Sequence, residues 1–124
     1  MNLFLDSSKG DMTVGIEDEL AIRVIEVIDV PKGSFVLDPY ADLRISAYLV
    51  PKLAENIRLA ISELIEQHRQ DVMDRLRLHT WPLWAENALN AEITKDTLLE
   101  ALKKLSILCT NAMEFDSDII VLGD

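Results

Sequence analysis

The longest pattern in the sequence is a helical one that begins at Pro51, a residue suited to the first turn of a helix. From there apolar residues recur at steps of three and four, and His68 occupies one of these positions. Opposite charges at helical spacing lie on the other face, including Glu66 with Arg69. The pattern predicts a helix from Pro51 to about His79 that forms the spine of the fold. Its inner positions are Leu53, Ile57, Ala60, Ile61, Leu64, His68, Val72 and Leu76.

A second amphipathic stripe lies in the last third of the chain. It predicts a helix that Thr94 would cap at its N-terminus. A short helix is expected over residues 83–89, directly after Pro82. The inner positions of the second helix would be Leu98, Leu102, Leu105, Cys109 and Ala112, and Leu99, Leu108 and Met113 would widen the stripe.

The remaining apolar segments favour strands. Residues 1–5 and Ile119 to Leu122 are short apolar runs. From Leu20 to Val30 apolar residues alternate with polar ones, and many are β-branched, so a strand is favoured there. A helix from Ile16 to Asp29 is the competing interpretation. Because the turn formers of residues 31–34 and the apolar run of residues 35–38 follow, residues 20–38 are expected to form a β-hairpin.

Together these elements predict an α+β fold in a single domain of residues 1–124. A hairpin and a terminal strand would form a small antiparallel sheet, packed by the long central helix and the second amphipathic helix. A mainly α-helical fold is the alternative, and it follows if residues 16–29 form a helix.

Length and composition indicate what kind of protein the chain is and in which compartment it is expected. With 124 residues, 49% of them apolar, the chain is long enough to bury a core without metal or disulfide. Neither a signal peptide nor a membrane span is expected, because residues 1–11 have no basic start and no apolar run in the sequence approaches about 20 residues. The single cysteine, Cys109, cannot form an internal disulfide, so a reduced, cytoplasmic protein is expected.

The net charge says more than the composition about possible partners. The net charge is −10, and the acidic excess lies in residues 1–42 and 79–124. Such a surface repels phosphate groups and anionic lipids, so neither nucleic acid nor a membrane is expected as a partner. The same charge would steer a basic protein partner toward the chain.

Catalytic and metal-binding patterns are weak. His68 lies on the apolar stripe, His79 near the end of the long helix, and Cys109 faces the predicted core, so no nucleophile has a base in reach. The acids Glu114, Asp116 and Asp118 lack the further ligands of a calcium loop. We therefore expect no enzyme, no cofactor and no metal.

Two segments remain as candidate binding sites. In the sequence VLDPYADLRIS, Tyr40 lies between Asp38 and Asp42, a composition typical of a protein-binding loop, although a connecting turn is the simpler interpretation. Asp42 would cap the turn or pair with Arg44. In HTWPLW, Trp81 and Trp84 flank Pro82 at a break between helices, where they either close the end of the core or lie exposed as contact residues.

In size, charge and lack of catalytic residues, the chain is similar to the small acidic immunity proteins that bacteria keep against their own toxins. The resemblance covers no alignable stretch and implies no site residues. It favours a non-enzymatic binding protein, an immunity-type inhibitor or adaptor, that acts on a basic partner. The alternatives are an enzyme or metal-dependent site built on Asp38, Asp42 and the C-terminal acids, and a structural subunit that forms a homodimer.

Overall fold

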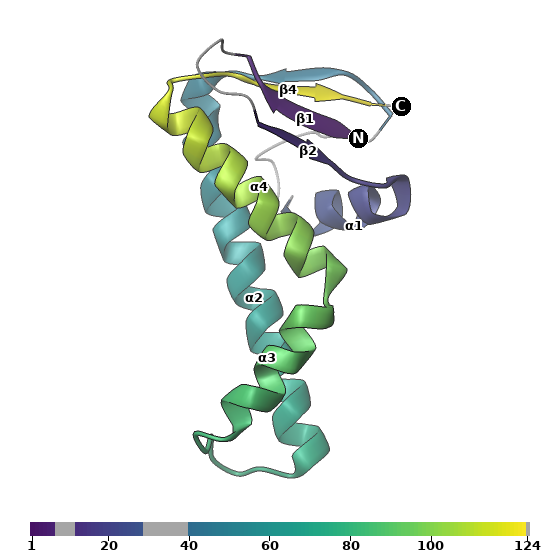
Figure 1. Cartoon of the computed structure of the whole chain (residues 1–124), viewed down its shortest axis with the longest axis vertical. Coiled ribbons are helices and arrows are strands. Elements are labelled where there is room, and N and C mark those ends of the chain that lie inside the picture. The colour runs from purple at the N-terminus through teal and green to yellow at the C-terminus, as the bar shows by residue number, and fades with distance from the viewer. Residues whose placement is uncertain (7–11, 29–39, 124) are drawn as a thin grey trace.

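The protein has a mixed α+β fold in which helices pack on one side of a small antiparallel sheet (Figure 1). The computed structural model describes residues 1–6, 12–28 and 40–123. Within them the sheet has the strand order β2-β1-β4-β3. Its strands are β1 (Asn2–Leu5), β2 (Thr13–Gly15), β3 (Leu43–Ile45) and β4 (Ile119–Leu122).

The sheet buries one face because side chains alternate along its strands. Val14, Leu3 and Val121 lie in one row of the register and point toward the helices. Asn2, Thr13 and Arg44 point the other way and are exposed. The buried residues of the sheet are Leu3, Leu5, Val14, Ile45, Ile119 and Val121.

The helices are α1 (Asp18–Ile28), α2 (Val50–Leu76), α3 (Ala85–Lys95) and α4 (Thr97–Glu114), and a short 3-10 helix, η1 (Ala47–Leu49), leads into α2. The first part of α2, α4 and α1 lie beneath the sheet (Figure 1). The inner faces of these helices and the buried face of the sheet form one core. Ile57 and Leu102 belong to this core and are 0% exposed. Among the described residues, no helix is both long and apolar enough to cross a membrane.

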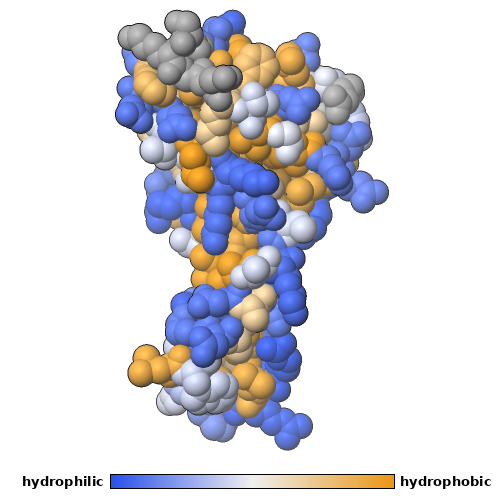
Figure 2. Space-filling view, viewed as in Figure 1, coloured by the Kyte–Doolittle hydropathy of each residue, from blue (hydrophilic) through white to orange (hydrophobic). Residues whose placement is uncertain are grey.

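The second half of α2 runs on past the core and is covered by α3. We call residues 65–95 the arm and the rest of the described chain the body. The arm is visibly narrower than the body (Figure 2). Val72, Ala85 and Leu89 are at most 2% exposed and lie outside the main core cluster, so the arm has a small core of its own.

The favoured strand at Leu20 to Val30 is wrong, and the competing helix is confirmed as α1. Ala21, Val24 and Ile28 are buried at steps of three and four, whereas Ile22, which the alternating pattern placed inward, is 40% exposed. Packing against the core therefore overrides the preference of β-branched residues for strands. The predicted hairpin loses its first strand, and its turn and second run lie outside the described residues.

The strands at the chain ends and the long helix are confirmed, but two helix boundaries were misplaced. Helix α2 ends at Leu76, where Arg77 adopts a left-handed conformation, with φ of 55°. Thr94 does not cap α4, because its hydroxyl donates to the Asn90 carbonyl inside α3. Asp96 is the cap, and its carboxylate accepts a hydrogen bond from the Leu99 amide. The short helix predicted over residues 83–89 is present as the longer α3.

Candidate interaction surfaces

The segment Tyr40 to Asp42 lies at the end of the sheet where the C-terminus emerges. Tyr40 is 57% exposed, and Asp42 is exposed as well. The Asp42 carboxylate accepts a hydrogen bond from the Gly123 amide at 3.0 Å. A Cβ added to Gly123 would lie 2.3 Å from the Ala41 nitrogen, so the two chain segments are closely packed. The backbone here is therefore held against β4, while the tyrosine ring faces solvent. Asp38 lies outside the described residues.

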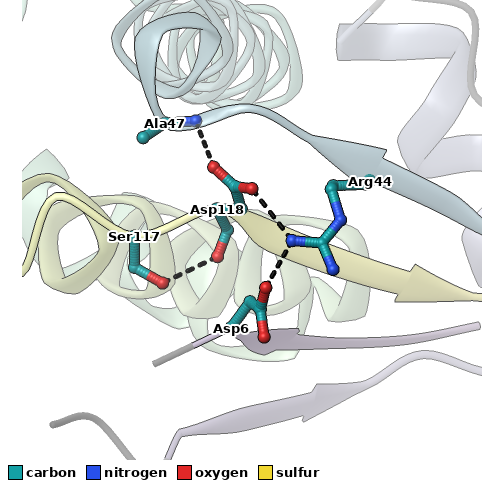
Figure 3. A network of polar contacts seen from close by, with 5 residues as sticks. All are labelled: Asp6, Arg44, Ala47, Ser117 and Asp118. Atoms are coloured by element: carbon teal, nitrogen blue, oxygen red, sulfur yellow. Dashed lines mark hydrogen bonds and ion pairs between the residues drawn. The ribbon is translucent and has the colours of Figure 1, made fainter. Parts of the chain in front are cut away.

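One sequence interpretation paired Arg44 with Asp42, and the structure shows other partners for Arg44. Its guanidinium contacts the carboxylates of Asp6 and, at 2.9 Å, Asp118 (Figure 3). The other Asp118 oxygen accepts a hydrogen bond from the Ala47 amide at 2.7 Å. These contacts, which we call the Arg44 clamp, join β1, β3, β4 and η1 on the outer face of the sheet.

The contacts of the clamp shift the pKa values of Asp118 and Arg44. The hydrogen bond from Arg44, reinforced by that from the Ala47 amide, lowers the pKa of Asp118 below its ordinary value. The same contacts with Asp6 and Asp118 raise the pKa of Arg44. With two carboxylates and one guanidinium, the clamp has a formal net charge of −1. Its acids are therefore engaged in holding the sheet together.

The two tryptophans have different roles. Trp81 is half-buried: its indole N–H donates to Glu86 at 2.7 Å, and the Arg69 guanidinium lies 5.4 Å from its ring centroid. These two contacts hold the Trp81 side chain against α2 and α3. Trp84 is 57% exposed and its neighbour Leu83 is 91% exposed. The tip of the arm thus presents two large apolar side chains to solvent.

The two candidate segments are not brought together. Tyr40 and Asp42 lie at one end of the molecule beside the C-terminus, and the loop between α2 and α3 that carries the tryptophans lies at the other (Figure 1). One compact partner domain would therefore meet one segment or the other.

Four exposed carboxylates lie at the same end of the sheet as Tyr40. The register places Gly15, Asn2, Leu122 and Asp42 in one row across the sheet. With strands about 4.8 Å apart, Asp42 and Gly15 are separated by about 14 Å. Glu17, Asp18 and Glu19 follow Gly15 after the buried Ile16 and are exposed. We call Glu17, Asp18, Glu19 and Asp42 the acidic end. None of its carboxylates forms an ion pair with a described residue.

Next to the acidic end, β2, α1 and α4 enclose a groove of about 420 Å³. Such a volume is typical of binding sites, which measure about 300–1,000 Å³. Ile16, Leu20 and Ala101 provide apolar lining. Charged residues also line the groove, and of these Glu100 is paired with Lys104 at 3.4 Å. The charged residues are Glu17, Glu19, Arg23, Glu100 and Lys104.

Of the two histidines and the cysteine, His68 is engaged, Cys109 is buried and His79 is exposed. His68 Nε2 lies 2.6 Å from the Asp96 carboxylate, in the seam between α2 and α4. Cys109 is 1% exposed, and burial raises the pKa of its thiol to about 12, which disfavours the reactive thiolate. Within residues 1–6, 12–28 and 40–123, no group of three or more histidine, cysteine or acidic side chains is arranged to hold a metal ion.

Sequence reasoning missed the groove, the Arg44 clamp and the acidic end. The run of three acids at residues 17–19 was a signal for the last of these, but only the register of β2 and β3 shows that Asp42 joins it. Leu83 was passed over because it lies between two tryptophans and a single leucine carries no pattern.

Comparison with known proteins gave no relative: no family model, no curated protein and no solved structure matches the chain.

Proposed function

We propose that the chain is a non-enzymatic binding protein, an immunity-type inhibitor or adaptor, that engages a basic protein partner in the cytoplasm through the acidic end. The observation that carries the proposal is the grouping of Glu17, Asp18, Glu19 and Asp42, all exposed, at one end of the sheet. Tyr40, exposed beside them, is the aromatic contact residue.

The distribution of charge supports this choice of surface. Residues 65–95 carry five acidic and four basic side chains, whereas the remaining residues carry 17 and eight. The arm is thus nearly neutral, and nine of the ten net negative charges lie in residues 1–64 and 96–124. Unpaired carboxylates on such a surface attract a basic partner over a distance of about one Debye length, roughly 8 Å at physiological salt.

The test begins with the protein retained most tightly by the immobilised full chain from an extract of the source cells. Its association rate with the wild-type chain is then measured by stopped flow at several salt concentrations. We expect a basic partner whose association slows steeply as salt is added, because electrostatic steering is screened.

A matched pair of variants locates the surface. The variant E17Q/D18N/E19Q is expected to associate about tenfold more slowly at low salt and to lose most of the salt dependence. The variant E66Q/D71N/D74N, which neutralises three acids of the arm, is expected to associate within about twofold of wild type. An acidic partner, or equal rates for both variants, contradicts the proposal. If the partner is an enzyme and its activity falls on binding, the protein is an inhibitor rather than an adaptor.

A further inference from the structure

The two outer strands of the sheet differ in what they offer a partner. β3 carries the charged Arg44, which the clamp holds on the outer face. β2 consists of Thr13, Val14 and Gly15 and has neither charge nor proline. Charged side chains and proline are the usual means by which proteins block the pairing of an edge strand. Of the two edges, only that of β2 lacks such a block.

The register identifies the backbone groups along this edge. Met1 and Ile16 exchange both of their backbone hydrogen bonds, at 3.0 and 2.9 Å. In an antiparallel pair such residues alternate with residues whose N–H and C=O point away from the partner strand. Val14 therefore faces β1, and the backbone groups of Thr13 and Gly15 face outward. None of them bonds to a described residue. The edge of β2 thus presents the donors and acceptors that a further strand requires.

The groove lies where the side chains of such a strand would point. Val14 and Gly15 form its wall on the sheet side, and α1 and α4 form the rest, both lying below β2 (Figure 1). A residue opposite Val14 in an added strand would turn its side chain to the same face as Val14, into the groove. There the apolar lining would contact an aliphatic stem, and Glu17 and Glu19 at the rim would accept its charged end.

We propose that an extended basic segment of the partner adds to β2 as a fifth strand, with a lysine or arginine side chain in the groove. This mode of recognition uses main-chain hydrogen bonds for affinity and a pocket for alternate side chains for specificity. It rests on the proposed function for the charge of the partner, and it adds the element that is bound and the conformation of the ligand.

Gly15 provides a matched pair of substitutions. A Cβ at Gly15 would meet only the end of the flexible Asn2 side chain, at 3.1 Å, so Gly15→Ala fits sterically once that side chain shifts slightly, and the Cβ of Gly15→Pro would meet the same atom. Proline also removes the outward N–H, and proline is tolerated on an edge strand whose N–H faces solvent. The Gly15→Pro variant therefore lacks one of the two outward donors of β2, whereas Gly15→Ala keeps both.

A second pair tests the groove without changing the backbone. Thr97 is exposed at the start of α4 and lines the groove. Thr97→Trp would fill the mouth of the groove. Thr110→Trp places the same side chain at another exposed position of α4, outside the groove residues. This pair keeps the proposal testable if Gly15→Pro fails to fold.

The probe is a phage-displayed library of linear 12-residue peptides, panned on the full chain, followed by calorimetry with the best synthetic peptide. We expect peptides in which lysine or arginine alternates with other residues. Gly15→Ala and Thr110→Trp should bind within about twofold of wild type. Gly15→Pro and Thr97→Trp should bind about tenfold more weakly, the loss expected for one hydrogen bond or one displaced side chain.

Three results overturn the proposal: no enrichment of any peptide, equal binding by both members of each pair, or enrichment of peptides without basic residues. The second result, obtained with basic peptides, removes strand addition and leaves the proposed function intact. The third result, with binding that still depends on Gly15 and Thr97, keeps strand addition at β2 but removes the basic ligand. It also contradicts the proposed function, because the edge then binds a segment of another charge.

Discussion

The body and the arm are built from the same kinds of helix but differ in charge and in core. The body contains the sheet, the main core cluster and most of the net negative charge. The arm is nearly neutral, and its core is reduced to a few side chains such as Val72, Ala85 and Leu89 between two helices. It ends in the exposed Leu83 and Trp84.

This difference separates two sources of recognition. Charge acts on the rate of encounter, while exposed aromatic and aliphatic side chains act on the lifetime of a complex. In this protein the charge lies on the body, whereas exposed apolar side chains lie both on the body, where Tyr48 is 80% exposed, and at the arm tip, where Leu83 is 91% exposed. The basic partner is assigned to the body, and the two regions are expected to differ in stability as well.

The largest effect is expected from truncating a leucine in each region. Leu102 in the body is 0% exposed and Leu89 in the arm is 2% exposed. Such a deletion costs about 2–5 kcal/mol, depending on how far the site can collapse. Leu102→Ala is expected near the upper limit and Leu89→Ala near the lower, because the thin arm can close around the gap. Urea unfolding followed by circular dichroism measures both.

Hydrogen exchange gives the control for this pair. Leu89→Ala should accelerate exchange in α3 and the end of α2 and leave the sheet unchanged. If both variants lost the same stability and each showed faster hydrogen exchange along its whole chain, arm and body would unfold as one unit.

A stabilising substitution is expected in the body at Asn56. This residue is 1% exposed on the inner face of α2, and neither polar atom of its side-chain amide has a hydrogen-bond partner. An unsatisfied buried polar group costs about 1–3 kcal/mol. Asn56→Leu keeps the branching and number of side-chain heavy atoms, and it should raise the free energy of unfolding by about that amount. A loss of stability instead would mean that the amide is satisfied by bound water.

The seam between the regions depends on Asp96. Burial raises the pKa of this carboxyl, but the hydrogen bonds with His68 and the Leu99 amide outweigh it and leave the pKa below its ordinary value. Asp96→Ala removes the cap and should cost about 1 kcal/mol at neutral pH.

Acid titration separates the cap from the charge. Because the folded pKa of Asp96 lies below the unfolded one, its ionic contribution is complete above the unfolded pKa and disappears as the pH falls through the folded one. Asp96→Asn keeps a capping oxygen but cannot ionise. The melting temperature of wild type should therefore exceed that of Asp96→Asn by less below about pH 4 than at neutral pH. A difference that is independent of pH would contradict this.

The smallest effect on stability is expected at Tyr40. Since 57% of this residue is exposed, Tyr40→Ala should change the free energy of unfolding by no more than about 0.5 kcal/mol, as is usual for surface substitutions. Partner binding should weaken by about 1–2 kcal/mol. Trp84→Ala, equally exposed at the arm tip, should change neither by much. A drop of many degrees in the melting temperature of Tyr40→Ala would show that the ring is a structural contact.

The sequence predicted the helices whose apolar pattern repeats over many residues and the strands at the two ends of the chain. The stripe of Leu53, Ile57 and Ala60 is unambiguous because it repeats over many turns. The segment at Leu20 to Val30 is short, and its apolar residues satisfy both periods, so only the exposure of Ile22 distinguishes them. The strands β2 and β3 were missed because three residues carry no period.

The candidate surfaces were predictable only in part. Tyr40 and Trp84 were named from composition, and both are exposed. The acidic end and the groove depend on strands that pair across the sheet, and pairing of this kind brings together residues that are far apart in sequence. Local pattern contains no information about it. For the same reason Arg44 was matched with the nearby Asp42 rather than with Asp6 and Asp118.

The most direct test of the account is hydrogen exchange of the full chain with and without the captured partner. We predict slower exchange of amides in β2, in the first turns of α1 and at the start of α4, with residues 76–84 at the arm tip unchanged. Protection confined to residues 76–84, with β2 unaffected, would contradict the assignment of the partner to the body.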